Sequence, residues 1–179
     1  NYAAVIDAIM NMADANASAY KAVKRRDPGS RVGFVHNMVA FTPADPSSSG
    51  DQQATAHAEY LFNRLFMDAA VLGIRDRDAD GIVDPGERNR RQAGKADFVG
   101  LNYYFRGRIG DLGAPLTQRI PLLDFLPSTQ YQSPANPGAP PCPTTCTEFG
   151  WEIYPQGFRQ VLGIAGGYGL PVIVTENGI

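Results

Sequence analysis

The sequence predicts an α/β fold in which parallel β-strands alternate with α-helices. Apolar residues recur at helical spacing in three segments, and three short runs rich in β-branched and aromatic residues separate or follow them. The predicted order is helix, strand, helix, strand, long loop, helix, strand. Such alternation favours parallel strands joined by right-handed crossovers, and each of the three runs ends in polar residues. We therefore expect the polar strand ends to converge on one site.

The first predicted element is an amphipathic helix from Tyr2 to about Arg26. Its apolar positions follow a helical period: Val5, Ile6, Ile9, Met10, Met12 and Ala13. Its last turns carry four cations, which suit the negative end of a helix dipole. The Pro28-Gly29 pair predicts where the helix ends.

A strand of mixed pattern is predicted over residues 31–41, followed by a loop over 42–50. Its polar interruptions are His36 and Asn37. His36 is either a hydrogen-bonded core histidine or a pocket residue, because buried polar groups are usually satisfied by partners. We expect Asn37 to face a pocket and to contact substrate.

A second helix is predicted from Asp51, a candidate N-cap, to about Leu72. The next strand covers residues 97–104 and is again polar at its end. A Pro- and Gly-rich stretch over residues 106–150 has no sustained period and predicts a long loop, which is either functional or disordered. A short helix should then begin at Pro155 and run to about Ile164, since proline suits a first helical turn.

The last strand opens after Pro171 with a β-branched run and delivers Glu176 and Asn177 at its C-terminal end. The pattern predicts a fully buried parallel strand. At the tip of such a strand a carboxylate can line a pocket away from solvent and serve as nucleophile, base or metal ligand. The alternative is a glutamate at the start of an ordinary surface loop.

Composition narrows the range of partners. With 16 basic and 18 acidic residues the net charge is -2, which gives no basic field for nucleic acid and no polybasic face for a membrane. No apolar run approaches the roughly 18 to 20 residues of a membrane helix. A neutral substrate such as carbohydrate is compatible with this balance. Because the chain starts at Asn1 without Met and stops soon after Glu176, we expect it to be cut at both ends.

The twelve residues from Asp76 to Glu87 resemble an EF-hand or dockerin-type calcium loop. Acidic side chains stand at positions 1, 3, 5, 9 and 12, and Gly81 at position 6 permits a sharp turn. The predicted oxygen ligands are Asp76, Asp78, Asp80, the carbonyl of Ile82, Asp84 and Glu87. The alternative is a solvated acidic turn between helices. Since no second loop of this kind pairs with it, we expect a Ca²⁺ staple rather than a calcium sensor.

The two cysteines, Cys142 and Cys146, lie close together in the sequence. They form either a small disulfide in an oxidising compartment or two unpaired thiols. No further Cys or His pair completes a zinc site, so we predict no metal here.

Three motifs, in residues 97–104, 150–157 and 174–178, resemble signatures of family 1 glycoside hydrolases, the β-glucosidase and β-galactosidase group. Residues 32–46 and 63–68 also resemble the fifth strand and the following helix of that family. The resemblance implies one partial (β/α)8 TIM barrel domain over residues 1–179, with about the fifth to seventh strands and their flanking helices. It breaks at 76–87 and in the cysteine-containing part of 106–150, which resemble insertions.

The resemblance also implies the chemistry. Glu176 would be the nucleophile of a retaining β-glycosidase that forms a covalent glycosyl-enzyme, and Tyr104 would hydrogen-bond it. Asn102 and Asn37 would contact a β-linked glycoside or oligosaccharide. The family needs no cofactor for catalysis. A cytoplasmic location is its default, whereas the cysteine pair and the calcium-like loop would suit an extracytoplasmic protein.

One part of the family pattern is missing from the sequence. The general acid/base of the family is a glutamate in an Asn-Glu-Pro motif, which these 179 residues lack. Retention needs two carboxyl groups about 5 to 5.5 Å apart. We therefore predict that the chain alone has no useful glycosidase activity. The alternative is a non-catalytic calcium- or sugar-binding α/β module.

Overall fold

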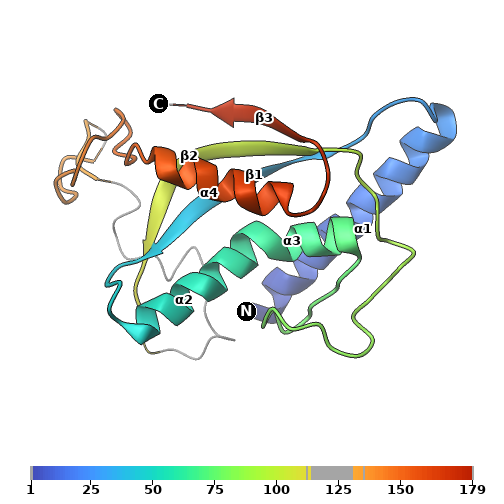
Figure 1. The fold of residues 1–179 in the computed structure, drawn as a ribbon, viewed down its shortest axis with the longest axis horizontal. Coiled ribbons are helices and arrows are strands. Elements are labelled where there is room, and N and C mark those ends of the chain that lie inside the picture. Colours follow the sequence, from blue (N-terminus) through green and yellow to red (C-terminus); the bar gives the residue numbers. More distant parts are fainter. Residues whose placement is uncertain (1, 112, 114–130, 135, 179) are drawn as a thin grey trace.

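The computed structural model describes residues 2–111, 113, 131–134 and 136–178, and Figure 1 shows its layered arrangement of helices beside one sheet. Three parallel strands form that sheet in the order β1, β2, β3. Their bounds are Phe34–Pro43, Val99–Ile109 and Val172–Asn177. The predicted parallel α/β architecture is therefore confirmed.

The helices also match the predicted order. They are α1 (Tyr2–Arg26), α2 (Ser49–Glu59), α3 (Leu65–Met67) and α4 (Pro155–Gly166), with π-helical turns η1 (Tyr60–Arg64) and η2 (Asp68–Leu72) on either side of α3. The helix predicted to begin at Asp51 thus runs through four segments to Leu72. None of the helices in the described part of the chain is long and apolar enough to cross a membrane.

The predicted N-cap of this second helix was wrong. Ser48 caps α2, because its hydroxyl accepts a hydrogen bond from the Asp51 backbone N–H at 3.2 Å. The Asp51 carboxylate instead accepts the backbone N–H groups of Asp45 and Asp111, at 2.9 and 2.8 Å. It therefore ties the start of α2 to the loops that follow β1 and β2.

The main core lies between the sheet and α4, which runs alongside the strands in Figure 1. Its buried residues are Met38, Ala40, Met67, Val99, Leu101, Tyr103, Val161, Ile164 and Ala165. The helix comes very close to the sheet at Gly157, where an added Cβ would lie 2.5 Å from the Ala40 Cβ. A side chain at this position would push α4 away from the strands.

Two further cores attach the remaining helices. One packs α1 on η1 and α3, and its buried residues are Ile6, Met10, Ala13, Leu61, Leu65, Ala69 and Ala79. The other joins α2 to the strands through Val39, Phe41, Ala54, Ala58 and Ile109. The alternation of Met38 and Ala40 with Val39 and Phe41 between two cores is the period-2 signature of a strand buried on both faces.

An irregularity in β1 is satisfied by a side chain. The register between β1 and β2 shifts between Met38 and Ala40. The backbone N–H of Val39 donates to Asn63 Oδ1 at 3.0 Å, and the Val39 carbonyl accepts from Asn63 Nδ2 at 2.9 Å. Asn63 is fully buried and belongs to η1, so the π-helical turn presents an amide that pairs with the strand backbone.

Two sequence predictions about the later strands need correction. The long loop was predicted to begin at residue 106, but β2 continues to Ile109, because Arg106 to Ile109 pair with β1. Residues 112, 114–130 and 135 of that loop lie outside the described residues. The last strand was predicted to be fully buried, yet β3 is exposed along most of its length, because it pairs on one side only and, apart from Val172, packs against none of the three cores.

Candidate active site

Strand pairing brings three of the predicted site residues into one row. The sequence placed all three at strand ends, which holds for Glu176, but Asn37 and Asn102 lie in the N-terminal halves of β1 and β2. Asn37 of β1 is the register partner of Asn102 of β2, and Asn102 is the register partner of Glu176 of β3. Register partners in neighbouring strands project to the same face of a sheet. The parallel arrangement therefore explains why residues 139 positions apart along the chain meet across one sheet.

Tyr104 and Glu176 are in direct contact. The phenol hydroxyl of Tyr104 donates a hydrogen bond to Glu176 Oε2. This hydrogen bond to the carboxylate raises the pKa of the Tyr104 phenol above its ordinary value, with a smaller contribution from burial. Tyr104 therefore stays protonated near neutral pH and serves as a hydrogen-bond donor to the carboxylate.

A second irregularity in the sheet orients the tip of β3. Leu101 pairs with Val174 and Asn102 with Glu176, so Thr175 is the extra residue of a bulge. The Thr175 hydroxyl donates to Asn102 Oδ1 at 2.5 Å. Beyond the bulge, Asn177 Nδ2 donates to the Tyr103 carbonyl at 2.8 Å. These contacts hold Glu176 at a defined position relative to β2.

The surroundings of Glu176 differ from the sequence prediction. We expected a carboxylate in a pocket away from solvent, but the Glu176 side chain is exposed. The reason is its position on β3, which pairs only with β2 and of whose residues only Val172 packs against a core.

An aromatic cavity of about 440 Å³ adjoins the Tyr104–Glu176 pair. Its lining comprises Tyr104, Cys146, Thr147, Glu148, Phe149, Trp151 and Gly178. The Trp151 ring lies 5.6 Å from the Tyr104 ring, 5.4 Å from the Phe105 ring and 5.5 Å from the Phe149 ring, centroid to centroid. The sequence analysis noted the motif that contains Trp151 but assigned it no role.

Close to these aromatic rings, Arg106 and Glu152 form a buried ion pair that was not predicted from the sequence. Arg106 contacts the Glu152 carboxylate through Nε at 2.9 Å and Nη2 at 2.5 Å. The guanidinium carbon of Arg106 also lies 4.2 Å from the centroid of the Tyr154 ring. No local sequence pattern predicts such a pair, because Arg106 and Glu152 are 46 residues apart.

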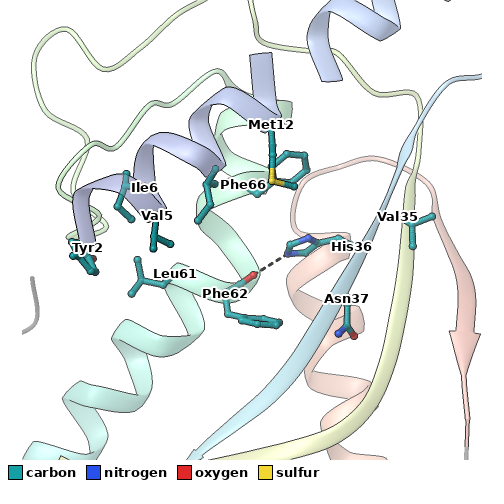
Figure 2. Close-up of a pocket in the computed structure, with 11 residues that line it drawn as sticks. Tyr2, Val5, Ile6, Met12, Val35, His36, Asn37, Leu61, Phe62 and Phe66 are labelled. Atoms are coloured by element: carbon teal, nitrogen blue, oxygen red, sulfur yellow. Dashed lines mark hydrogen bonds between the residues drawn. The ribbon is translucent and has the colours of Figure 1, made fainter. Parts of the chain in front are cut away.

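The predicted substrate residue Asn37 lines a different cavity, of about 360 Å³, between α1, β1 and η1 (Figure 2). This cavity is mostly apolar and includes Phe62 and Phe66. In Figure 2 the His36 ring points to Phe62, and Nε2 lies 3.0 Å from the Phe62 carbonyl oxygen. Burial lowers the pKa of His36, so the neutral ring donates to that carbonyl. His36 is therefore hydrogen-bonded and also lines the cavity, so the two alternatives do not exclude each other here.

The calcium-like loop gathers three of its predicted ligands. Carboxylate oxygens of Asp76, Asp78 and Asp80 lie within 4.8 Å of one another. Asp76 is fully buried and accepts the N–H groups of Ala79 and Gly81, at 2.5 and 2.8 Å. Its carboxylate also accepts the Tyr60 hydroxyl at 2.6 Å.

The later positions of the loop are arranged differently. Glu87 Oε1 accepts the Arg77 N–H at 3.1 Å, and Oε2 accepts the Asp84 N–H at 2.9 Å. Asp84 and Glu87 do not join the three-aspartate group among the described residues. The backbone carbonyl of Ile82 was the fourth predicted ligand, and the Ile82 side chain is largely exposed.

The two cysteines form a disulfide, which decides between the two alternatives left by the sequence. The Cys142–Cys146 bond closes a five-residue ring next to a short antiparallel turn, because Cys146 forms an isolated bridge with Glu152. The described residues contain no free cysteine. The disulfide therefore supports the segment that carries the aromatic wall.

Comparisons with known proteins identify the family of the chain. The sequence profile of glycosyl hydrolase family 1 matches residues 1–179. The β-galactosidase of Pyrococcus woesei is 30% identical over 185 residues, which cover 96% of this chain and 35% of the relative. The chain thus spans about a third of the length of the curated relatives it matches.

Solved structures give the same result. A β-glycosidase from Pyrococcus horikoshii superposes with a TM-score of 0.68 at 29% identity, covering 96% of this chain and 34% of that one. The β-glycosidase of Thermosphaera aggregans gives a TM-score of 0.68 at 26% identity, covering 94% and 31%. These neighbours are TIM barrels, so the three strands and their helices are part of a (β/α)8 barrel. Since the family profile covers its whole length, the chain belongs to glycosyl hydrolase family 1.

Proposed function

We propose that this chain supplies the nucleophile side of a retaining β-glycosidase. The observation that carries the proposal is the hydrogen bond from the Tyr104 hydroxyl, in the middle of β2, to Glu176, near the C-terminal end of β3. Glu176 is accessible to a substrate, and an aromatic cavity adjoins it. Aromatic faces suit the apolar faces of sugar rings, and the pyranose of a β-linked glycoside is the proposed occupant.

The reaction proceeds in two displacements. A Glu176 oxygen attacks the anomeric carbon, the bond to the glycosidic oxygen breaks, and a protonated carboxyl group delivers a proton to the leaving oxygen. Water, deprotonated by that same group, then cleaves the glycosyl ester and restores Glu176. Tyr104 orients the nucleophile and stabilises its charge through the hydrogen bond. This scheme needs no cofactor.

The second carboxyl group is the missing part of the scheme. It should lie about 5 to 5.5 Å from the nucleophile in a retaining enzyme. The 179 residues contain no Asn-Glu-Pro motif, which carries this group by the family resemblance. We therefore expect the purified chain to show no useful turnover, and activity to appear only where another segment supplies the acid.

The decisive experiment joins the chain to such a segment. Residues 1–179 replace the matching part of the Pyrococcus woesei β-galactosidase, and the chimera is incubated with an activated 2-deoxy-2-fluoro-β-glycoside. The fluorine slows breakdown of the glycosyl-enzyme, so the intermediate accumulates and can be found by peptide mass spectrometry. We expect the label on Glu176, and no label or turnover in the Glu176→Gln chimera.

The control separates the residue assignment from the activity of the host. Glu59→Gln removes a carboxyl of α2 that does not line this cavity and should leave the labelling of Glu176 intact. Turnover that survives Glu176→Gln would contradict the assignment of the nucleophile. Tight glycoside binding without any turnover or label would instead support the sugar-binding alternative.

We also propose that the loop over residues 76–87 binds Ca²⁺ as a structural staple. The supporting observation is the gathering of three aspartates, Asp76, Asp78 and Asp80, within 4.8 Å. Like charges at this spacing repel, and a dication coordinated by hard oxygens would relieve that repulsion. Glu87 would close the site only after it exchanges its hydrogen bonds with backbone N–H groups for the ion.

The test is a calcium-dependent change in thermal unfolding. A bound ion should stabilise the chain by about 2.7 kcal/mol at a free concentration about one hundred times Kd. EDTA should reverse the shift, and the Asp78→Asn/Asp80→Asn variant should abolish it. The matched control, Asp7→Asn/Asp27→Asn, changes the net charge equally outside the loop. An unfolding temperature that is the same with and without Ca²⁺ would favour the alternative, a solvated acidic turn.

The disulfide is relevant to the cellular compartment of the protein. Disulfides persist in oxidising compartments and are rare in reducing ones. We infer that the Cys142–Cys146 bond suits an extracytoplasmic protein better than the cytoplasmic default of the family. Thiol alkylation of the native protein in its source cells, before lysis, tests the inference. Full alkylation of both cysteines would contradict it.

A further inference from the structure

The segment over residues 142–154 is built as a platform for one aromatic ring. Thr147 N–H donates to the Trp151 carbonyl at 2.9 Å, and Ile153 N–H donates to the Thr145 carbonyl at 2.9 Å. These bonds pair two short arms around a tight turn. We call residues 142–154 the Trp151 platform.

The turn of the platform depends on Gly150. Its φ is 78°, a left-handed value that glycine adopts without strain. An added Cβ would lie 2.1 Å from the Tyr131 carbonyl oxygen, so a side chain does not fit. The tight turn therefore fixes the direction in which the chain continues from Gly150 to Trp151.

The side chains of the arm that carries Trp151 alternate between its two sides. Successive residues of an extended arm point to opposite sides, so Trp151 and Glu152 face different ways. Trp151 is half-buried and lines the cavity beside Tyr104, whereas Glu152 is buried beneath the platform.

Four consecutive residues of β2 hold this arm. The Tyr103 hydroxyl donates to the Tyr154 carbonyl at 2.7 Å. The rings of Tyr104 and Phe105 pack on the Trp151 ring. Arg106 makes the ion pair with Glu152. Each residue from Tyr103 to Arg106, in the middle of β2, therefore contacts the platform.

The Arg106–Glu152 pair is the most directional of these contacts. Glu152 accepts from two guanidinium nitrogens, a fork geometry that fixes angle as well as distance. Its side chain is 3% exposed, and burial makes any loss of its partner costly. The Thr144 hydroxyl, inside the disulfide ring, also donates to Glu152 at 3.3 Å.

We infer that Glu152 is a positioning residue of the aromatic cavity. Through its buried pair with Arg106 it holds the Trp151 ring beside Tyr104, and this ring forms the cavity wall that a bound glycoside contacts. Glu152 touches no reacting atom in this scheme. The inference rests on the proposed function for the glycoside, but the placement of Trp151 by Glu152 can be measured without one.

Trp151 is the only tryptophan of the chain, so its fluorescence reports on this platform alone. The experiment compares the emission spectrum and acrylamide quenching of the wild-type chain with those of Glu152→Gln, which keeps the shape and removes the charge. We expect a shift to longer wavelength and a quenching constant that rises about twofold, because the half-buried ring becomes exposed. Far-UV circular dichroism should stay unchanged.

The matched control is Glu59→Gln. It also removes a Glu–Arg ion pair, since Glu59 contacts Arg64 at 3.0 Å, but its partners lie on the helices and not in the platform. Its tryptophan signal should equal that of the wild type. If Glu152→Gln fails to fold, Glu152→Asp replaces it, because aspartate keeps the charge and shortens the reach. An unchanged Trp151 signal in a folded Glu152 variant would overturn the inference.

Adding a nitrophenyl β-glycoside to the chimera separates this inference from the proposed function. Weaker glycoside binding in Glu152→Gln, seen as a raised KM with little change in kcat, is the expected result. If Glu152→Gln shifts the Trp151 emission of the ligand-free chain as expected but no glycoside binds, Glu152 remains a positioning residue. The proposed glycosidase function would then be contradicted.

Discussion

At the scale of single residues, the Tyr104–Glu176 hydrogen bond gives a direct prediction. Tyr104→Phe removes the donor but keeps the ring that packs on Trp151. A hydrogen bond to a charged group contributes about 2 kcal/mol, so kcat/KM of the active chimera should fall by a factor of about thirty. Steady-state kinetics with a nitrophenyl glycoside would measure it. Unchanged kinetics would mean that the phenol has no part in stabilising the nucleophile.

Asp97 provides a prediction about pH. Its hydrogen bond with Lys24 is the largest cause that lowers its pKa from 3.8 to about 2, followed by one from the Val32 N–H. Because the folded-state pKa is depressed, this carboxylate contributes stability above pH 3.8, and the contribution is lost as pH falls towards 2.

The measurement is urea unfolding at several pH values. Wild type should lose stability between pH 3.8 and about 2, and Asp97→Asn should be less stable near neutral pH and show a flatter acid dependence. Ser30→Ala is the comparison, since it removes a hydrogen bond to the Asp27 carbonyl at 2.9 Å without removing a carboxylate and should leave the slope unchanged. Equal slopes in wild type and Asp97→Asn would contradict the prediction.

Which residues could be foreseen depends on how local their signal is. Glu176 and Tyr104 stand at the ends of strand-like runs, and their contact follows from the family resemblance. Glu152 and Arg106 gave no such signal, because a charge pair formed across 46 residues has no period and no fixed spacing. The exposure of Glu176 was also missed, since a β-branched run does not say whether its strand is central or at an edge.

At the scale of elements, the π-helical turn η1 gives a stability prediction. Asn63→Ala would leave the Val39 N–H and carbonyl without their buried partners. The free energy of unfolding should fall by about 2 to 4 kcal/mol, because each unsatisfied buried group costs ~1–3 kcal/mol. Urea denaturation measures the loss.

Asn16→Ala is the matched control. It removes one partly buried bond, from Asn16 Nδ2 to the Lys95 carbonyl at 3.1 Å. That change should cost no more than about 1 kcal/mol. Similar losses in the two variants would show that the Val39 backbone finds other partners.

The disulfide gives the second prediction at this scale. Closing a ring of five residues lowers the entropy of the unfolded chain by an amount worth about 2 kcal/mol. Cys142→Ser/Cys146→Ser should lose about that much in unfolding free energy. A reducing agent should produce the same loss in wild type and no further loss in the variant. An effect of reductant on the variant would point to a different cause.

The elements themselves were largely predictable and their details were not. Hydrophobic period and proline placement located α1, α4 and all three strands. The π-helical turns in residues 60–72 carry the same apolar period as an ordinary helix, so the sequence predicted one helix. The N-cap was misplaced because Ser48 and Asp51 both suit an N-cap, and only the tertiary contacts of Asp51 with Asp45 and Asp111 decide between them.

At the scale of the whole molecule, the sheet exposes apolar side chains. Val35 and Ile173 are register partners of Gly100 from either side and are 55% and 46% exposed. Exposed apolar residues on strands favour association between chains. Val35→Thr/Ile173→Thr should reduce light scattering at high concentration with little change in stability, because threonine keeps the β-branch. Val99→Thr, at a fully buried strand position, should instead lower stability.

The pairing of the strands also dictates the order in which the molecule can be assembled. Phe34 pairs with Val99, 65 residues later, and Val99 pairs with Val172 after a further 73 residues. During synthesis the sheet cannot begin before Val99 has left the ribosome, while α1 and the helices of residues 49–72 can already pack. Long separations slow folding, because loop closure costs entropy before the contacts form. Of the three described strands, β3 with Glu176 is therefore synthesised last, and it pairs only with β2.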